Sequence, residues 1–410
     1  MKLLYIVDGR SPTAINWISY FIHTGHEIHL VSTSVFQPPD GLASFEVIPV
    51  ALSDIYGHSE VRSEERRKLL RRVVPVELRT RIRQLVAPLT FHHAANTLWE
   101  VIKRIQPDLI HAMRIPYEGM IASMAMSRSE IVGGGVKKPP LLVSVWGNDF
   151  TLHARSTPVM AFYTRQTLHN CDALHTDCQR DLNLARGLGF ASNKSGIVLP
   201  GGGGVKMDIF YPPEKGQEDE GNPPKLAKSP VTVINPRGFR AYVRNDTFFQ
   251  AIPMVLNGYP DVHFVCPGMD GEAQAQKWIA ELRLGEQVEL LPNQSRLGMA
   301  DLFRQSQISL SITTHDGTPN TLLEAMACGC FPIAGDIESL REWITPEVNG
   351  LLVDPGDPKM LAEAILTAIS QPDLRRQAKE RNLHLIRERA EYEKVMHSVE
   401  DYYHSLVLKK

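Results

Sequence analysis

The first 34 residues constrain the fold most, because they carry a complete strand, helix and strand. The apolar run LLYIVD leads through the polar turn GRSPT into the amphipathic stretch AINWISYFIHTG, and the apolar run EIHLVST follows. Short apolar runs on either side of a helical period are typical of a strand–helix–strand unit. Such units build parallel sheets, so residues 2–34 predict an α/β fold.

The same alternation continues along the chain with one interruption. Further strand candidates lie at 107–112, 141–146, 173–177 and 196–200. Together with the first strand–helix–strand unit they predict a doubly wound domain over residues 1–205. Residues 213–230 are rich in Pro, Gly and charge and predict a linker or exposed loop. Six more strand candidates then predict a second domain over 206–390, namely VTVINP, HFVCPG, VELLP, SLSIT, FPIAG and GLLVD.

We therefore expect an α/β protein with two Rossmann-like domains that face each other across a cleft. Ligands of such sheets bind at the carboxyl ends of the strands, so the cleft is the predicted binding site. Residues 391–410 predict a C-terminal helix that could pack back on the first domain.

Composition excludes several classes of protein. A chain of 410 residues has room for two domains, and its net charge of -2 argues against a partner that is a nucleic acid. The five cysteines are odd in number and lack C-x-x-C spacing, which indicates reduced core residues in a cytoplasmic protein. No segment has the pattern of a signal peptide or the ~20 apolar residues of a membrane-spanning helix.

Residues 315–335, HDGTPNTLLEAMACGCFPIAG, carry the strongest sign of function. They predict a helix capped by Thr318, with Pro319 in its first position and Gly329 at its end. The first turn of a helix offers free backbone N–H groups and the positive end of its dipole. We expect this turn to bind a phosphate or the hydroxyl oxygens of a sugar.

Glu324 follows Thr321 and Asn320 by three and four residues, so it lies on the same helix face as the helix start. Its two oxygens suit the two hydroxyl groups of a ribose. The alternative is that Glu324 caps or salt-bridges a surface helix. The flanking Leu-Leu and AMACG favour a largely buried helix and therefore the ribose.

This segment resembles the E-x7-E signature of glycosyltransferase family 4, retaining enzymes of the GT-B fold. The second acid is Glu324, and Asp316 takes the place of the first, which gives D-x7-E. The resemblance implies that Glu324 holds the donor ribose and that Asp316 contacts the transferred sugar. It also implies that the intervening residues bind the sugar and the diphosphate, through the backbone of Gly317, Thr318, Pro319, Asn320 and Thr321.

Residues 233–252 resemble the family's G-R-L-x-x-x-K-G element, which neutralises the leaving diphosphate. Arg237 matches the arginine, whereas the lysine aligns with Val243, so Arg240 or Arg244 would have to replace it. A bond that breaks to release a diphosphate needs concentrated positive charge nearby. The alternative is that these arginines only cover a surface turn.

The first domain resembles the family at LLVSVWGNDF, residues 141–150, where a strand usually ends in H-G-x-D. Asp149 is retained and is expected to be catalytic with Asp316 and Arg237, while Trp146 stands where histidine is usual. Trp146 could stack on a sugar ring or fill the core. The loop of residues 8–17 lacks G-x-G-x-x-G, which disfavours a nicotinamide dinucleotide. The acceptor side is predicted to contain Arg10, Asn16, His111 and Arg114.

Residues 62–88 are basic with interleaved apolar residues. This pattern is typical of a helix that lies on an anionic membrane surface, and equally of a solvated helix face. A peripheral position at the inner face of the membrane is therefore one expectation for this otherwise cytoplasmic protein.

Together these features predict a retaining hexosyltransferase that uses a nucleoside diphosphate sugar, with UDP-glucose or UDP-N-acetylglucosamine as the first guesses. The acceptor is expected to be a saccharide or a lipid-linked saccharide, in polysaccharide or glycan biosynthesis. The departing phosphate would take the acceptor proton, without an enzyme nucleophile. No cofactor and no metal are predicted, since no D-x-D motif follows a strand. The alternatives are a nucleotide-sugar epimerase and a non-catalytic binding module.

Overall fold

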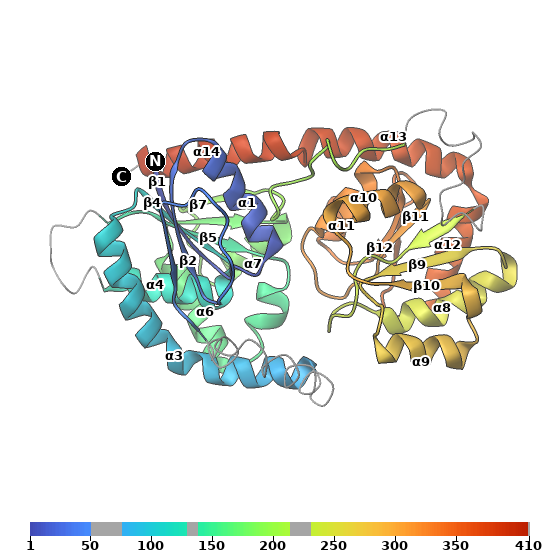
Figure 1. Cartoon of the computed structure of the whole chain (residues 1–410), viewed down its shortest axis with the longest axis horizontal. Coiled ribbons are helices and arrows are strands. Elements are labelled where there is room, and N and C mark those ends of the chain that lie inside the picture. Colours follow the sequence, from blue (N-terminus) through green and yellow to red (C-terminus); the bar gives the residue numbers. More distant parts are fainter. Residues whose placement is uncertain (51–75, 129–137, 214–230, 409–410) are drawn as a thin grey trace. The chain divides into compact units, whose positions relative to one another are not determined.

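The computed structural model describes residues 1–50, 76–128, 138–213 and 231–408, with the side chains of 76–88 excepted (Figure 1). The chain forms two compact units. The first unit comprises Met1–Gly203 and the residues from Met396 onward, and the second unit comprises Gly204–Val395. Most of segment 213–230, and residues 62–75 of the basic segment, lie outside the described residues.

The first unit is built on a seven-stranded sheet in the order β3-β2-β1-β4-β5-β6-β7, and all its strand pairs are parallel. Its strands are β1 Lys2–Val7, β2 Glu27–Ser32, β3 Ser44–Val47, β4 Leu109–Met113, β5 Leu141–Val145, β6 Ala173–Thr176 and β7 Ser195–Val198. Strand order reverses between β1 and β4. Ligands of doubly wound sheets bind beyond the carboxyl ends of the strands at such a reversal.

Helices cover this sheet, and in α1 the capping residue and the buried side chains can be read from the sequence. Their bounds are α1 Pro12–His23, α3 Val76–Ile105, α4 Met120–Ser127, α6 Pro158–Asn170 and α7 Gln179–Gly187, with π-helical turns η2 Ile115–Gly119 and η3 Asp149–His153. In α1, the Ser11 hydroxyl accepts from the Ala14 N–H and Pro12 occupies the first turn. Trp17 and Phe21, one turn apart, are fully buried against the sheet.

The C-terminal helix α14, Tyr392–Leu408, packs on the first unit as the sequence predicts. The Tyr403 ring stacks on Phe21 with centroids 4.9 Å apart. The Tyr403 hydroxyl accepts a hydrogen bond from Trp17 Nε1 at 3.0 Å. Burial of the Tyr403 ring against Phe21 contributes apolar contact area that holds α14 on the first unit.

The second unit has a six-stranded sheet in the order β10-β9-β8-β11-β12-β13, again parallel throughout. Its strands are β8 Thr232–Ile234, β9 His263–Pro267, β10 Val288–Leu291, β11 Ile308–Ser311, β12 Phe331–Gly335 and β13 Leu351–Val353. Its helices are α8 Asn245–Gly258, α9 Ala273–Leu282, α10 Arg296–Gln305, α11 Asn320–Ala327, α12 Pro358–Ser370 and α13 Pro372–Arg389, with 3-10 turns η4 Gly285–Gln287 and η5 Leu340–Glu342. Here the strand order reverses between β8 and β11.

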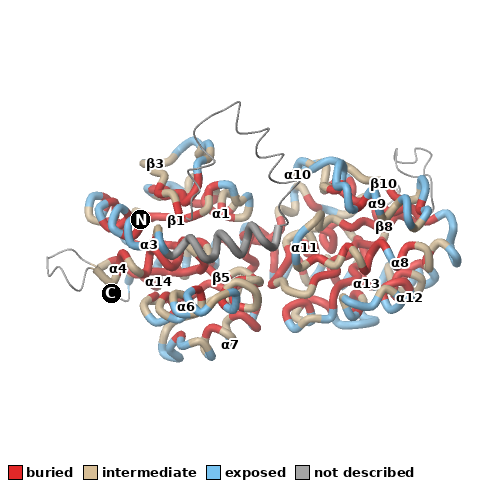
Figure 2. Tube along the Cα trace, turned by 90° about the horizontal axis from the view of Figure 1, so that it is seen from below, coloured by how far each residue is buried: buried red, intermediate tan, exposed pale blue. Residues whose placement is uncertain are grey.

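Both faces of the second sheet are buried. Val233 and Ile333 belong to the core cluster on one face, and the next residues along their strands, Ile234 and Ala334, belong to the cluster on the other. Figure 2 shows that the strands of both sheets carry mainly buried residues and that most of the exposed residues lie on helices and loops. The prediction of two Rossmann-like domains is confirmed.

Two further sequence expectations concern the whole chain. All five cysteines are buried and free, and burial raises the pKa of the Cys171 thiol to about 12. Within the parts of the chain that the structure describes, no helix combines the length and apolarity needed to cross a bilayer.

Candidate functional site

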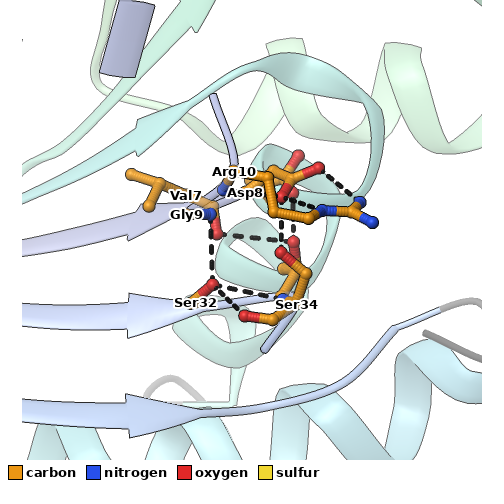
Figure 3. Close-up of polar contacts among 8 residues, drawn as sticks. Val7, Asp8, Gly9, Arg10, Ser32 and Ser34 are labelled. Carbon is orange, nitrogen blue, oxygen red and sulfur yellow. Dashed lines mark hydrogen bonds and ion pairs between the residues drawn. The ribbon is translucent and has the colours of Figure 1, made fainter. Parts of the chain in front are cut away.

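The reversal point of the first sheet is marked by a charged pair that follows β1. Arg10 donates from Nε and Nη2 to the two oxygens of Asp8, at 2.9 and 2.8 Å (Figure 3). The Ser34 hydroxyl, after β2, donates to Asp8 Oδ1 at 2.5 Å. Burial alone would raise the pKa of Asp8, but the bonds from Arg10 and Ser34 outweigh it and lower the pKa to about 2. Arg10 is therefore held in one position against an ionised carboxylate.

Glu118 lies beside this pair, and sequence reasoning missed it. The Thr33 hydroxyl donates to Glu118 Oε1 at 2.5 Å, and Glu118 is only 2% exposed. Burial raises the pKa of Glu118 to about 7, since the bond from Thr33 only partly offsets it. The turn that brings Glu118 inward is strained, with φ of 129° at Arg114 and 71° at Tyr117. Strain of this kind concentrates at functional sites, and positive φ at two non-glycine residues is not visible in a sequence.

Asp149 is fully buried where β5 ends. Its Oδ1 accepts from Arg114 Nε at 2.9 Å, and its Oδ2 accepts from the backbone N–H of Trp146 at 3.0 Å. Arg114 also donates from Nη2 to Asn148 Oδ1 at 3.0 Å. Asp149 therefore holds Arg114 and the Trp146 turn in place, and its direct catalytic role stays a prediction.

Trp146 keeps partial exposure, and its indole Nε1 is buried without a hydrogen-bond partner in the described chain. The ring lies close to Gly201, where an added Cβ would come within 3.3 Å of Cδ1. The Arg114 guanidinium lies 6.0 Å from the ring centroid. A buried indole N–H without an acceptor is an unused donor, and stacking on a sugar or donation to it by Trp146 stays a prediction.

Among the residues that the structure describes, three side chains after β6 lie close enough together to share a cation. The candidate ligand atoms of Asp177, Cys178 and Asp181 lie within 4.8 Å of one another. Arg180 donates from Nη2 to Asp181 Oδ1 at 2.8 Å and to the Gly147 carbonyl at 2.7 Å. The guanidinium already supplies positive charge here, so we assign this group to the structure of the loop.

Two of the predicted acceptor-side residues have their polar groups engaged. His111 is 1% exposed; its Nδ1 lies 2.6 Å from the Tyr403 hydroxyl and its Nε2 lies 2.7 Å from Ser144 Oγ. Asn16 donates from Nδ2 to the Gly202 carbonyl at 2.7 Å. His111 could bind an acceptor only if this buried network opened, whereas Arg10 and Arg114 lie at the strand ends themselves.

The second unit holds the other predicted residues at the carboxyl ends of β8 and β11. Arg237 forms an ion pair from Nη2 to Asp316 Oδ2, and the two side chains are only 10% and 16% exposed. Nη1 of Arg237 donates to Thr321 Oγ1 at 3.4 Å, while its Nε is buried without a partner in the described residues. The predicted arginine, the first acid and the start of α11 are therefore brought together, with one N–H still unused.

The loop that carries Arg237 is fastened to the segment that carries Asp316. Arg244 N–H donates to the Ile312 carbonyl at 2.9 Å, and Thr314 N–H donates to the Tyr242 carbonyl at 2.9 Å. The Arg244 side chain is taken by Asp246, at 2.8 and 2.7 Å. Arg240 is exposed and donates only weakly, at 3.4 Å, to the Arg237 carbonyl. Replacement of the family lysine by Arg240 or Arg244 stays a prediction.

Helix α11 starts one residue later than the sequence suggests. Pro319 is its N-cap, with ψ of 124°, and Asn320 is the first helical residue. The Thr318 hydroxyl does not cap the helix but accepts from Trp343 Nε1 at 2.9 Å. Asp316 is fixed by its neighbours, since its carbonyl accepts from the Ser339 hydroxyl at 2.7 Å and its Oδ1 accepts from Gly317 N–H at 3.1 Å. The first turn of α11 still presents N–H groups beside Arg237.

Glu324 lies on the partly buried face of α11, one turn after the helix start. Burial raises the pKa of its carboxyl to about 7, and the charge of Arg296 offsets this only in part. A carboxylate with so little compensation is costly to keep ionised, and hydroxyl donors from a ligand would lower that cost. This is the environment expected of a group that receives the hydroxyl groups of a ribose.

Comparison with protein families agrees with this geometry. Residues 14–202 match the glycosyl transferase 4-like domain, and residues 217–384 match glycosyl transferases group 1. A D-inositol 3-phosphate glycosyltransferase of Thermobispora bispora is 29% identical over 94 residues, 23% of this chain and 22% of that protein. A GDP-mannose:cellobiosyl-diphosphopolyprenol alpha-mannosyltransferase of Xanthomonas campestris is 30% identical over 111 residues, 26% of this chain and 29% of that protein.

Solved structures share the fold over the whole chain. Sucrose-phosphate synthase from Thermosynechococcus elongatus superposes with a TM-score of 0.73 at 14% identity, covering 100% of both chains. Anabaena HepE in complex with UDP superposes with a TM-score of 0.70 at 14% identity, covering 99% of this chain and 100% of that chain. This likeness extends over both units and supports the GT-B fold, which has two Rossmann-like domains.

Proposed function

We propose that this chain, which belongs to the glycosyltransferases of the GT-B fold, transfers a hexose from a nucleoside diphosphate sugar to a saccharide or lipid-linked acceptor with retention of configuration. The observation that carries the proposal is the Arg237–Asp316 pair at the ends of β8 and β11. It combines a guanidinium, a carboxylate and the start of α11 in one buried place, and a free N–H of Arg237 remains.

Each group has a role in this reaction. The Arg237 guanidinium and the first N–H groups of α11 neutralise the diphosphate as it leaves, and charge stabilisation of this kind is the largest single contribution to many transfers. Asp316 contacts the transferred sugar, and Glu324 accepts the hydroxyl groups of the ribose. The departing phosphate oxygen takes the proton of the attacking acceptor hydroxyl, so the enzyme needs no nucleophile of its own.

The nucleotide and the acceptor belong to the proposal as well. HepE is described in complexes with UDP and with UDP-glucose, so UDP-sugars are the first donors to test. No cofactor and no metal take part in the scheme, and activity should therefore survive a chelator. A loss of turnover in EDTA that magnesium restores would contradict this part of the scheme.

The test measures thermal shifts with UDP, GDP, ADP and their common sugar conjugates. A ligand at ~100 times its dissociation constant stabilises the folded state by ~2.7 kcal/mol, which one nucleotide family should produce. Glu324→Ala should remove the shift. Product analysis with the matching donor then separates transfer with retention from epimerisation of the donor sugar. A chain that binds none of these nucleotides would refute the proposal.

Contact with an anionic membrane remains part of the proposal for residues 62–88. Only the helical backbone of 76–88 in α3 is described, and the remaining residues lie outside the described chain. Flotation of the full chain with vesicles that contain anionic lipid tests this contact. Recovery of the protein only from the bottom fraction would exclude it.

A further inference from the structure

A pocket of about 500 Å³ lies in the first unit, next to the Asp8–Arg10 pair. Its volume is in the ordinary range for sites that bind small molecules. The wall is mainly apolar and is formed by Pro12, Ile15, Phe36, Pro38 and Pro39. All of these residues follow the carboxyl ends of the neighbouring strands β1 and β2, at the edge of the sheet where ligands of parallel sheets bind.

Phe36 is a fixed part of this wall. Its ring lies against Gly9 so closely that an added Cβ there would come within 2.0 Å of Cδ1 and Cε1. Phe45 supports the ring from the edge, at a centroid distance of 5.3 Å and an interplanar angle of 86°. Phe36 still keeps partial exposure. A rigid, accessible aromatic face suits the apolar C–H face of a sugar ring, because no side-chain freedom is lost when the ring binds.

The polar groups of the pocket are Arg10, Gln37 and Asp40. Arg10 has five N–H donors, and it directs two of them to Asp8. Arg10 and Asp40 both line the pocket, so it offers hydrogen-bond donors as well as acceptors. Sugar hydroxyl groups both donate and accept, so they can use both kinds of partner.

The charges of this wall decide between neutral and phosphorylated ligands. One guanidinium, that of Arg10, and one carboxylate, that of Asp40, line the pocket, and Arg10 is bonded to a second carboxylate, that of Asp8, so the net charge of these three groups is negative. Despite burial, the bonds from Arg10 and Ser34 lower the pKa of Asp8 to about 2, so the Asp8 carboxylate is ionised at neutral pH. A phosphate group would meet repulsion from Asp40 and would have to share Arg10 with Asp8.

We propose that this pocket binds a neutral, unphosphorylated sugar ring of the acceptor, stacked on Phe36 with its hydroxyl groups on Arg10 and Asp40. That the bound sugar is an acceptor rests on the proposed function, whereas binding of the sugar in this pocket does not. It separates this chain from proteins whose names specify phosphorylated acceptors or products, such as the D-inositol 3-phosphate glycosyltransferase and the sucrose-phosphate synthase.

The test measures binding of sugars to the full chain by saturation-transfer NMR. The probes are glucose, mannose and N-acetylglucosamine, together with glucose 6-phosphate and mannose 6-phosphate. We expect at least one neutral sugar to bind about tenfold more tightly than the phosphates, on the strength of one aromatic contact and one unfavourable charge. Tighter binding of a phosphorylated sugar, or no binding of any neutral sugar, would overturn the inference.

Two variants locate the binding in this pocket. Phe36→Ala should weaken the neutral sugar about tenfold, and Phe162→Ala, which removes a 60% exposed ring on α6 of the same unit, should have no effect. Asp40→Lys changes an exposed side chain and tests the charge argument even if Phe36→Ala folds poorly. It should narrow the preference for neutral over phosphorylated sugar, and an unchanged preference would contradict the role of Asp40.

Failure here can be told apart from failure of the proposed function. A chain that binds a nucleoside diphosphate through Glu324 but prefers phosphorylated sugars keeps the proposed transfer and loses this inference. A chain that binds neutral sugars through Phe36 but binds no nucleotide loses the proposed transfer and keeps the pocket.

Discussion

Replacement of Glu324 by Gln should stabilise the protein and weaken donor binding at the same time. Burial raises the pKa of Glu324 from an ordinary 4.5 to about 7. A shift of this size corresponds to roughly 3 kcal/mol, which we lower to about 2 kcal/mol because the side chain keeps partial contact with water. Glutamine has nearly the same shape and no charge to bury, so it avoids this cost.

The sign of the effect depends on pH. The unfolded chain ionises Glu324 near pH 4.5 and the folded chain near pH 7, so folding takes up a proton between these values. The carboxyl therefore costs nothing below pH 4.5, and its full destabilising effect is present above pH 7. Relative to Glu324→Gln, the wild type should be equally stable at pH 4.5 and less stable by about 2 kcal/mol at pH 8.

Calorimetry of both proteins at pH 5 and pH 8 measures this difference. We expect the melting temperature of the second unit to rise by roughly 4–8 °C at pH 8 in the variant, and by much less at pH 5. Glu363→Gln, on the exposed face of α12 in the same unit, is the matched control and should change little at either pH. An equal gain at both pH values would refute the burial argument.

Nucleotide affinity of the wild type should rise with pH, whereas its stability relative to Glu324→Gln falls. The ionised carboxylate is the better acceptor of ribose hydroxyls, so the nucleotide affinity of the wild type should increase from pH 6 to pH 8. Loss of a hydrogen bond to a charged group costs about 1.5–3 kcal/mol, so Glu324→Gln should bind roughly 10- to 100-fold more weakly. Titration calorimetry checks both points. Unchanged affinity in the variant would place the ribose elsewhere.

Three further predictions concern buried polar groups. Asp316→Asn should lower kcat about 100-fold while nucleotide affinity is retained, and Arg237→Ala should lower both, as steady-state kinetics and thermal shift would show. Arg114→Ala leaves Asp149 buried without its cation and should cost about 3–5 kcal/mol in denaturant unfolding of the first unit, with Arg114→Lys in between. Tyr403→Phe should cost about 1–3 kcal/mol, because it leaves the Trp17 N–H and His111 Nδ1 without their partner; an unchanged melting temperature would contradict that network.

The sequence predicts the two sheets well because parallel strands are short apolar runs with a strong local signal. It misses β3, Ser44–Val47, an edge strand whose residues are all only partly buried. It also places the start of α11 one residue early, because Thr318 and Pro319 fit the cap and first position in isolation. In the structure the Thr318 hydroxyl accepts a hydrogen bond from Trp343, 25 residues away, and this contact has no local signature in the sequence.

The site shows the same division between local and distant information. Arg237, Asp316 and Glu324 are predicted from motifs, because each motif is local: Arg237 follows the end of β8, and Asp316 and Glu324 lie between the end of β11 and the first turns of α11. Glu118 has no motif of its own and acquires its meaning from a strained turn and from Thr33, 85 residues earlier. Without a motif, a buried carboxyl such as Glu118 can be recognised only when the surrounding core is known.

The buried network of the first unit illustrates why a histidine at a strand end is hard to interpret from sequence. His175 Nε2 lies 2.9 Å from the Leu199 carbonyl, which can only accept, so Nε2 carries the proton and Nδ1 accepts from Ser144.

Ser144 Oγ then accepts from His111 Nε2, and His111 Nδ1 accepts from Tyr403, whose oxygen receives the Trp17 N–H. Every donor in this series of hydrogen bonds has one acceptor. The Leu199 carbonyl alone therefore determines which atom of each group carries the proton. Burial lowers the pKa of both histidines, to about 4 for His175, so both are neutral near pH 7 and the order is preserved. The network therefore links the end of β7 to α14 through neutral groups, and it explains why His111 is used for the attachment of the C-terminal helix.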